Sequence, residues 1–473
     1  MGEKREIQFL VKFSIVNLSE IRADNDLFRI DAGYWRPDFI ANSRLISREK
    51  KIRDFVCAEI ANIKSSPIDR DFEYLEISKI SMSACAYETT TIAVGSKPDR
   101  AHYILKRGDI AVSTVRPNRN AIAFVEKDGI VGSSGLSILR AAGIQPEYLF
   151  VFCKTRYFVN CLVRANKATM YPAVSNEDVL NTPLLVASDR FRSCIAEVFQ
   201  NSFACLKEAK KQYVGGENVL LSELGLADWQ PKHQISFAKN YSDTESAGRI
   251  DADYFQPKYE KISNAIKSCK GGWDVLSNLV TIQKSVEVGS AEYLDAGIPF
   301  VRVSNLNPFE ITEEKYISKE LYAEIKQHQP NMGEILLSKD GTPGIAHYLH
   351  EQPKKMIPSG GILRLKSKKT GKVNGEYLAL VLNSVLTKEQ VERDVGGSVI
   401  LHWRPEQVKN LLIPILPKGK QTAIQEKIVK SSGLRARSKH LLNCAKTAVE
   451  LAMEKDEKAA MRWLKDNAGK TPA

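Results

Sequence analysis

The sequence lacks several patterns that mark common classes of enzyme. No two glycines stand in a G-x-G arrangement, so the glycine-rich turn that holds an adenosine cofactor is missing. No two prolines are adjacent, which excludes the Asn-Pro-Pro-aromatic signature of amino-methyltransferases. The triplet Thr370-Gly371-Lys372 lacks the preceding glycine that a phosphate-binding loop needs. We therefore expect no cofactor, and no catalysis by this chain alone.

Paired cysteines and long apolar runs are also absent. The eight cysteines are scattered singly, without a CxxC pair, so we expect reduced thiols of an intracellular protein. The longest apolar-rich stretch, LALVLNSVL, is far shorter than the roughly 20 residues that cross a bilayer. The N-terminus, MGEKREIQF, has no apolar signal core. We therefore expect a cytoplasmic protein without a membrane partner.

Length and positive charge are what the chain has in excess. Its 473 residues exceed the size at which a single hydrophobic core stops growing, so two or more domains are expected. The net charge is +12 and the pI is near 9.1. Such a positive potential favours a polyanionic partner, although many soluble proteins are mildly basic without one.

The chain contains a long internal repeat. RIDAGYWRPDF, which starts at Arg29, returns as RIDADYFQPKY, which starts at Arg249. Later pairs follow in the same order: RGDIAVS with MGEILLS, SSGLSILR with PSGGILR, EYLFVF with EYLALV, and NEDVLNTPLLV with PEQVKNLLIPI. The offset is 220 residues from Arg29 to Arg249 and 229 from Glu147 to Glu376. Ordered matches at such similar offsets indicate a duplicated domain.

Each copy combines strand-like runs with a closing helix. DIAVSTV, AIAFVE and LSILRAA, like EILLS, IAHYLH and GILRL, are short, rich in β-branched residues and separated by turn residues. Helices are expected over 188–214, ending at Gly215-Gly216, and over 417–466, where Gly433 could bend the helix. The apolar stripes are Phe191, Ile195, Val198, Ser202, Cys205, Leu206 and Ala209 in the first helix and Ile424, Ile428, Leu434, Leu441, Ala445, Ala448 and Ala452 in the second.

The two stripes must be buried. Pairing of the two helices with each other, antiparallel, is the economical solution, and the alternative is that each helix packs on its own domain. A stripe over ~25 residues, near 38 Å at 1.5 Å per residue, would overhang a small domain, which favours pairing. We predict an α+β fold in which two strand-rich, mixed α/β domains are joined and followed by two long helices.

The repeated segments also carry a family resemblance. The matching features occur in order: RIDAGYWRPDF or RIDADYFQPKY at each domain start, the GDI or GEI strand ending in Ser, the EDV and EQV segments, and LLIPILPKGKQTAIQEKI before the long helix. With this order the chain resembles the specificity subunit of type I restriction-modification systems. The first copy departs from the pattern, because VASDRFRSCIAEV lacks the Pro and Gln found in the second.

The resemblance implies both a function and a domain plan. Each copy would be a target recognition domain that reads one half of a split DNA sequence. The helices would hold the halves apart and dock two methyltransferase subunits, through which restriction subunits join. The implied plan is 1–187 and 216–416 for the recognition domains, 188–215 and 417–466 for the helices, and 467–473 for a tail.

Two loops in each copy are candidates for contact with DNA, because Arg, Lys, Asn, Gln and Thr side chains can reach base edges and phosphates. The first loop supplies Ser113, Thr114, Arg116, Asn118, Arg119 and Asn120, or, in the second copy, Ser338, Lys339, Asp340 and Thr342. The second loop supplies Lys167, Thr169, Met170 and Tyr171, or Ser398, His402, Trp403 and Arg404. Any one of these could be an ordinary solvated turn residue. As a set they share position but differ in sequence, which favours recognition.

The RIDA segment is alike in both copies, and identical residues cannot read different bases. We therefore expect Asp31 and Asp251 to have a structural or partner-docking role.

Two further patterns suggest catalytic alternatives. Pro37-Asp38 with Glu49 and Lys51 spells the PD…ExK pattern of nucleases, in which acids on adjacent strands hold magnesium. However, PDFIANSRLISREKKI has a helical pattern, and the second copy, PKYEKISNAIKS, lacks these acids. His347 and His350 form HxxH without the glutamate of a zinc site, so we expect loop histidines and no metal. A self-contained nuclease or modification enzyme, and a free-standing DNA-binding regulator, remain the alternatives.

Overall fold

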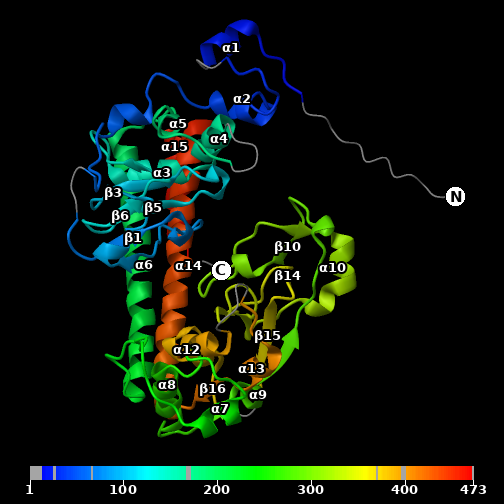
Figure 1. Cartoon of the computed structure of the whole chain (residues 1–473). Helices are drawn as coiled ribbons and strands as arrows, with labels where there is room; N and C mark the ends of the chain where they lie inside the picture. Colours follow the sequence, from blue (N-terminus) through cyan, green and yellow to red (C-terminus); the bar gives the residue numbers. More distant parts are fainter. Residues whose placement is uncertain are drawn as a thin grey trace, which may run out of the picture. The chain divides into compact units, whose positions relative to one another are not determined.

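The computed structural model describes residues 13–24, 28–64, 68–166, 172–368, 371–395 and 401–470 (Figure 1). They form two compact units, of which unit 1 is Met1–Lys207 with Leu434–Ala473 and unit 2 is Glu208–Gly433. Two long helices, α6 (Asp189–Glu223) and α14 (Lys418–Glu454), contribute residues to both units. The main hydrophobic cluster of each unit contains residues of that unit alone, so each copy of the repeat has its own core.

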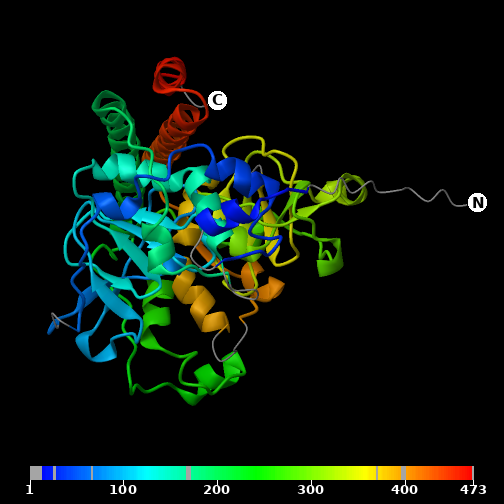
Figure 2. The ribbon, with the colours of Figure 1, turned by 90° about the horizontal axis from the view of Figure 1, so that it is seen from above.

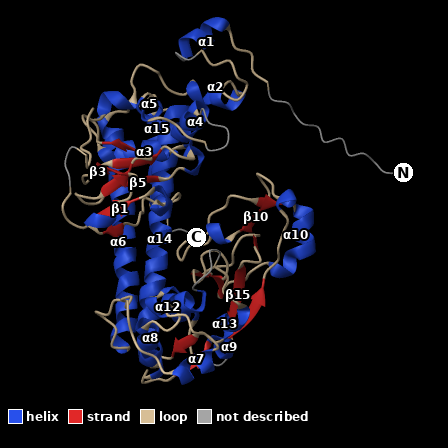
Figure 3. Cartoon of the chain, viewed as in Figure 1, coloured by secondary structure: helices blue, strands red, loops and turns tan. Residues whose placement is uncertain are grey.

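Unit 1 consists of two small sheets with helices around them (Figure 3). Its strands are β1 (Phe72–Leu75), β2 (Thr90–Ile92), β3 (Ala101–Ile104), β4 (Ile110–Ser113), β5 (Ile122–Phe124), β6 (Val131–Ser133) and β7 (Leu136–Leu139). Its other helices are α1 (Leu18–Asp24), α2 (Pro37–Ser43), α3 (Pro146–Lys154), α4 (Arg156–Ala165), α5 (Asn176–Leu180) and α15 (Glu457–Ala468). The strand order is β2-β1-β6-β3 in one sheet and β5-β4-β7 in the other.

Unit 2 has three sheets. Its strands are β8 (Trp273–Val275), β9 (Val280–Lys284), β10 (Ile298–Val301), β11 (Tyr316–Ile317), β12 (Glu334–Ser338), β13 (Ala346–Tyr348), β14 (Ile357–Pro358), β15 (Ile362–Ser367) and β16 (Leu412–Pro414). Its other helices are α7 (Tyr241–Ala247), α8 (Pro257–Lys267), α9 (Leu276–Leu279), α10 (Lys319–Ile325), α11 (Gly375–Asn383), α12 (Val385–Val395) and α13 (Pro405–Lys409). The strand orders are β11-β10-β14, β13-β12-β15-β9 and β16-β8.

The sheet topology is duplicated. In unit 1, β4 lies antiparallel between β5 and β7, and in unit 2, β12 lies antiparallel between β13 and β15. The parallel pair β1–β6 likewise corresponds to the parallel pair β10–β14. Both β4 and β12 are buried along their whole length, as expected for apolar runs covered on both faces. The predicted α+β fold with a duplicated strand-rich domain is confirmed.

A buried ion pair explains one of the repeated motifs. The acid of GDI, Asp109, accepts two hydrogen bonds of 2.8 and 2.7 Å from Arg140 at the end of β7. The acid of GEI, Glu334, accepts two of 2.9 and 3.1 Å from Arg364 in β15. The Asp109 carboxylate raises the pKa of Arg140. A bidentate pair satisfies both charges inside each domain, so these two positions are fixed by the scaffold.

The two long helices are paired and run side by side (Figures 1 and 2). In unit 1, the Ser202 hydroxyl donates to the carbonyl oxygen of Ser438 at 2.8 Å. In unit 2, the Ser431 hydroxyl donates to the carbonyl oxygen of Ala209 at 2.7 Å, and Lys420 forms an ion pair with Glu223. Higher numbers in α6 meet lower numbers in α14, so the predicted antiparallel pairing is confirmed.

The predicted end of the first helix is wrong. The helix continues through Gly215-Gly216 to Glu223 and ends before Gly225, whose φ of +66° suits glycine. A Cβ on Gly216 would lie 3.4 Å from the Ile428 side chain of α14. Gly216 thus faces α14 inside a continuous helix, and the low intrinsic helix propensity of the two glycines does not end the helix there.

Two other helix boundaries also differ from the prediction. The segment expected as one helix over 417–466 is divided into α14 and α15, because Asp456 caps α15 by accepting a 2.7 Å bond from the amide of Ala459. Gly433 lies inside α14. PDFIANSRLISREKKI is helical only to Ser43, after which Leu45 and Ile46 pack against the core of unit 1.

Candidate nucleic-acid interface

The first predicted loop of unit 1 is a tight turn after β4. Arg116 and Asn120 flank the short 3-10 helix Pro117–Arg119, and both have a left-handed backbone, with φ of 50° and 54°. This conformation costs free energy for a residue with a side chain, so the surroundings must hold it. The Arg116 and Asn118 side chains are exposed, and those of Thr114 and Arg119 are half-buried.

Lys154, which the sequence analysis did not predict, stabilises this turn by hydrogen bonding to its main chain. Its side chain is fully buried, and its Nζ donates to the carbonyl oxygens of Asn120 at 2.9 Å and Met82 at 3.3 Å. The side-chain Nδ2 of Asn120 also donates a hydrogen bond to the main-chain carbonyl oxygen of Lys154 at 3.0 Å. A lysine that closes the apolar run EYLFVFC is the signal that could have revealed it, because a buried amino group must find acceptors.

The first loop of unit 2 is closed in a related way. The Ser338 hydroxyl donates to the carbonyl oxygen of Thr342 at 2.6 Å and accepts from the amide of Ile345 at 2.9 Å. Lys339 forms an ion pair with Asp340. The Thr342 side chain is exposed, so it is the one that this loop presents most openly to solvent among its predicted contacts.

The second loops lie partly outside the described residues, which do not include Lys167, Thr169, Met170, Tyr171 or Ser398. His402 is exposed, and its Nδ1 lies 2.9 Å from Oδ1 of Asp340. Burial raises the pKa of Asp340, but Lys339 and His402 together hold that pKa below its ordinary value. Arg404 is exposed and stands directly before α13.

Three of the predicted contact residues are not on the surface. The sequence predicts DNA contacts for Ser113, Ser338 and Trp403, but the structure buries all three side chains. The Ser113 hydroxyl donates to the carbonyl oxygen of Val115 at 2.8 Å, and the Trp403 indole donates to Oδ2 of Asp394 at 3.2 Å. These side chains hold the loops, because each has its polar atom bonded inside the domain.

The structure brings the two loops of each copy together by the same pair of main-chain bonds. In unit 1, the Arg116 amide donates to the carbonyl oxygen of Pro172 at 2.7 Å, and the Val174 amide donates to that of Thr114 at 2.9 Å. In unit 2, Gly341 donates to Leu401 at 2.9 Å, and Trp403 donates to Lys339 at 2.8 Å. The bonded positions correspond one to one through the repeat. Each copy therefore presents its two loops as one joined surface.

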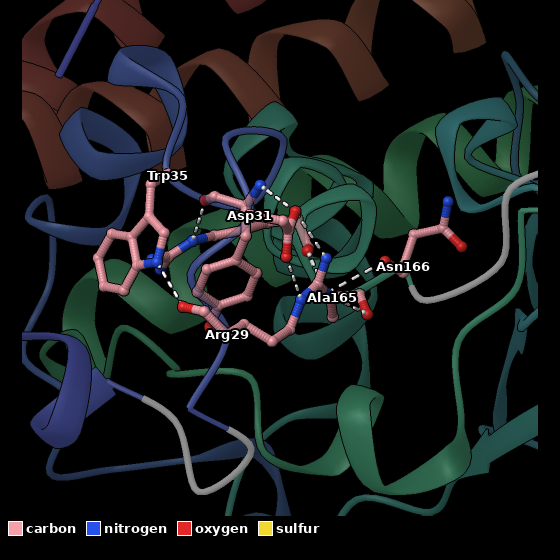
Figure 4. A network of polar contacts seen from close by, with 7 residues as sticks. Arg29, Asp31, Trp35, Ala165 and Asn166 are labelled. Atoms are coloured by element: carbon pink, nitrogen blue, oxygen red, sulfur yellow. Dashed lines mark hydrogen bonds and ion pairs between the residues drawn. The ribbon is translucent and has the colours of Figure 1, made fainter.

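The repeated RIDA segment is a braced turn. Arg29 pairs with Asp31 through bonds of 2.9 and 3.2 Å, and its other nitrogen donates to the carbonyl oxygens of Ala165 and Asn166, at the end of α4 (Figure 4). The Trp35 indole donates to the carbonyl oxygen of Arg29 at 2.6 Å. Hydrogen bonding to Arg29 lowers the pKa of Asp31. A cation at a helix C-terminus also offsets the partial negative charge there.

Unit 2 repeats this turn. Arg249 pairs with Asp251 through bonds of 2.7 and 2.6 Å, and hydrogen bonding to Arg249 lowers the pKa of Asp251. The Arg249 guanidinium lies 4.4 Å from the centre of the Tyr254 ring, and that of Arg393, in α12, lies 5.5 Å from it. The structural role expected for Asp31 and Asp251 is thus visible as the ion pair that holds each turn.

Apolar side chains beside the turns are exposed at equivalent positions. Ile15 and Ile235 stand 220 residues apart in the sequence, as do Ile30 and Ile250. All four side chains have relative exposures of 71% or more. Ile15 follows Ser14, whose hydroxyl donates to the carbonyl oxygen of Trp35, so its segment runs along the turn. Exposed isoleucines at equivalent places are thus a surface feature that the two copies share.

The residues of the PD…ExK pattern lie apart from any strand. Asp38 is in α2 and pairs with Arg36 at 2.7 Å. His347 lies in β13, so it is not the loop residue expected, and burial lowers its pKa. Within the described ranges, no three His, Cys, Asp or Glu side chains gather as a metal site requires. In the same part of the chain, no helix combines the length and apolar character needed to span a membrane.

Comparison with solved structures finds type I restriction-modification proteins. A chain from a study of complex assembly and conformational transition of the type I R-M system matches with 17% identity, 88% coverage of this chain, 96% of that chain and a TM-score of 0.30. The HsdS subunit from Thermoanaerobacter tengcongensis matches with 19% identity, 88% and 95% coverage and a TM-score of 0.28. The S subunit from M. genitalium matches with 12% identity, 88% and 95% coverage and a TM-score of 0.32.

No family model matches the chain, and no curated protein does.

Proposed function

We propose that this chain is a non-catalytic, sequence-specific DNA-binding subunit of a type I restriction-modification complex and that it reads a target in two halves. The joined loops carry the proposal. The same two main-chain bonds hold them in both copies, whereas the exposed side chains differ: Arg116 and Asn118 in unit 1, and Thr342, His402 and Arg404 in unit 2. One scaffold with two sets of exposed residues suits two different half-sites.

The chemistry of the exposed residues supports contact with base edges. Arg can bind guanine through two hydrogen bonds and Asn can bind adenine in the same way, which suits Arg116 and Asn118. The net charge of +12 supplies attraction to phosphates that does not depend on sequence. The proposed recognition domains are 1–187 and the part of 216–416 that follows α6, which ends at Glu223.

We further propose that each copy docks one methyltransferase subunit, at exposed isoleucines in place of the long helices that the family resemblance implies, and that restriction subunits join through the methyltransferase subunits. The isoleucines Ile15 and Ile30, and their equivalents Ile235 and Ile250, support this part of the proposal. Residues that are identical in both copies cannot read different bases, but they can contact two identical protein subunits. Two equivalent surfaces suit a stoichiometry of two.

Selection from a random DNA library with the purified chain tests the recognition role. We expect the bound sequences to contain two fixed parts separated by a gap of unspecified bases. The same preparation, incubated with DNA, magnesium and S-adenosylmethionine, should neither cut nor methylate the DNA. Catalysis without a partner would favour a self-contained enzyme. A chain that binds DNA but forms no stable complex with a methyltransferase subunit would favour a free-standing regulator.

A further inference from the structure

In each copy, a residue near the end of one helix accepts a hydrogen bond from an N–H group that follows the second loop. In unit 1, Asn166 directly follows α4, and its Oδ1 accepts a 3.0 Å hydrogen bond from the amide of Ala173. In unit 2, Asp394 lies in the last turn of α12, and its Oδ2 accepts a 3.2 Å bond from the indole of Trp403. In both copies a side-chain oxygen before the loop thus binds an N–H group after it.

The environment of Asp394 shows how tightly this closure is built. The main-chain carbonyl oxygen of Asp394 accepts a 3.0 Å hydrogen bond from the side-chain Nε2 of Gln407. Its carboxylate lies 3.4 Å from the Arg393 guanidinium. Burial raises the pKa of Asp394, while Arg393 and the Trp403 indole favour the charged form. The carboxylate is only 13% exposed, so these partners supply much of the hydrogen bonding that water would otherwise give it.

The closure is continuous with the residues proposed to read DNA. Trp403 separates the exposed His402 from the exposed Arg404, and its own side chain is only 1% exposed. The Trp403 amide is also one of the two main-chain groups that join the loops. A shift of the indole would therefore displace His402 and Arg404 together.

The RIDA turn of each copy also contacts the end of the same helix. Arg29 donates to the carbonyl oxygens of Ala165 and Asn166, the last residues before the second loop of unit 1. In unit 2, the Tyr254 ring of the turn lies 5.5 Å from the guanidinium of Arg393, which directly precedes Asp394 in α12. A turn that is alike in both copies thus supports the start of a loop that differs between them.

We propose that Asn166 and Asp394 are positioning residues. Each bonds to an N–H group that follows its second loop, and so positions the described exposed side chains beside that bond, Arg116 and Asn118 in unit 1 and His402 and Arg404 in unit 2, against one half of the DNA target. This inference rests on the proposed function. Neither residue needs to touch DNA. Each acts through the N–H group that it holds, Ala173 in unit 1 and Trp403 in unit 2.

Three substitutions in unit 2 test the inference. Asp394→Ala removes the acceptor, Asp394→Asn keeps an oxygen that can accept the indole N–H, and Trp403→Phe removes the donor while keeping an aromatic ring. We expect Asp394→Ala and Trp403→Phe each to reduce discrimination at the unit 2 half-site on the order of tenfold. Asp394→Asn should retain most of it. The double variant Asp394→Ala/Trp403→Phe should lose no more discrimination than either single variant, because each of the two substitutions removes the same hydrogen bond.

Asn166→Ala is the matched control, because it should reduce discrimination only at the other half-site. The readout is selection from a library in which both halves are randomised, together with thermal unfolding of each variant. Equal loss at both half-sites in Asp394→Ala would reveal a merely structural role and overturn the inference. A wild-type chain that selects a two-part target while Asp394→Ala and Trp403→Phe select it equally well would overturn the inference alone. A wild-type chain that selects no two-part target would overturn the proposed function itself.

Discussion

The buried ion pair between Glu334 and Arg364 gives a prediction of defined magnitude. Their side chains are only 4% and 6% exposed. Arg364→Met keeps much of the side-chain volume but leaves the Glu334 carboxylate uncompensated between β12 and its neighbours. Removing one partner of a buried pair costs roughly 3–5 kcal/mol, because the remaining charge stays in an apolar interior. We expect the free energy of unfolding of unit 2 to fall by about this amount.

The repeat supplies a matched control for this substitution. In the equivalent pair of unit 1, Asp109 is 1% exposed but Arg140 is 21% exposed, so water reaches its guanidinium more easily. Arg140→Met should therefore cost less than Arg364→Met. The double variant Glu334→Gln/Arg364→Met should recover much of the loss, because it leaves no unpaired charge behind.

Hydrogen exchange resolved by peptide separates the two units in this experiment. Arg364→Met should speed exchange of the β12 and β15 amides more than Arg140→Met speeds exchange of the β4 and β7 amides. Equal effects of the two substitutions would refute the argument from burial. Failure of the double variant to recover would refute the argument from uncompensated charge.

Three further predictions concern DNA and partners. Arg116→Ala with Arg119→Ala should weaken binding at one half-site by a few kcal/mol, since a good base contact discriminates by ~1–3 kcal/mol; a footprint that shows loss at both halves, or at neither, contradicts the assignment. Lys154→Met should lower the free energy of unfolding by roughly 1–3 kcal/mol, because buried carbonyl groups lose their donor; an unchanged thermal unfolding curve would argue against it. Ile30→Ser with Ile250→Ser should abolish binding of both methyltransferase subunits, and each single change should leave one bound, as light scattering of the purified complex can measure; two subunits on the double variant would rule out these surfaces.

The duplicated fold was accessible to sequence reasoning because the repeat provides an internal comparison. RGDIAVS and MGEILLS, together with the arginines that end SSGLSILR and PSGGILR, occupy the positions that the buried ion pairs require. The end of the first long helix was not accessible, because Gly216 is a helix breaker by local propensity and a helix contact by tertiary packing. The neighbour of Gly216 in α14, Ile428, is far away in the sequence, so local propensity gives no sign of this contact.

The candidate site was predictable in place but not in detail. Both loops could be located, because each follows or precedes a repeated segment and differs between the copies. Burial of Ser338 and Trp403 could not be inferred, since a hydroxyl or an indole beside a loop can face solvent or bond within the domain. Lys154, Asn166 and Asp394 were missed because their role depends on partners brought close only by the fold.

The two hydrogen bonds that join the loops in both copies are between main-chain atoms, and this has a consequence for how the protein can change over time. The amides of Arg116 and Gly341 donate at equivalent positions, although one residue has a long cationic side chain and the other has none. This main-chain hydrogen bond therefore does not depend on which side chain the donating residue carries. If the proposed function holds, substitutions at the exposed positions would change which bases are read, while the main-chain bonds that join the loops would be retained.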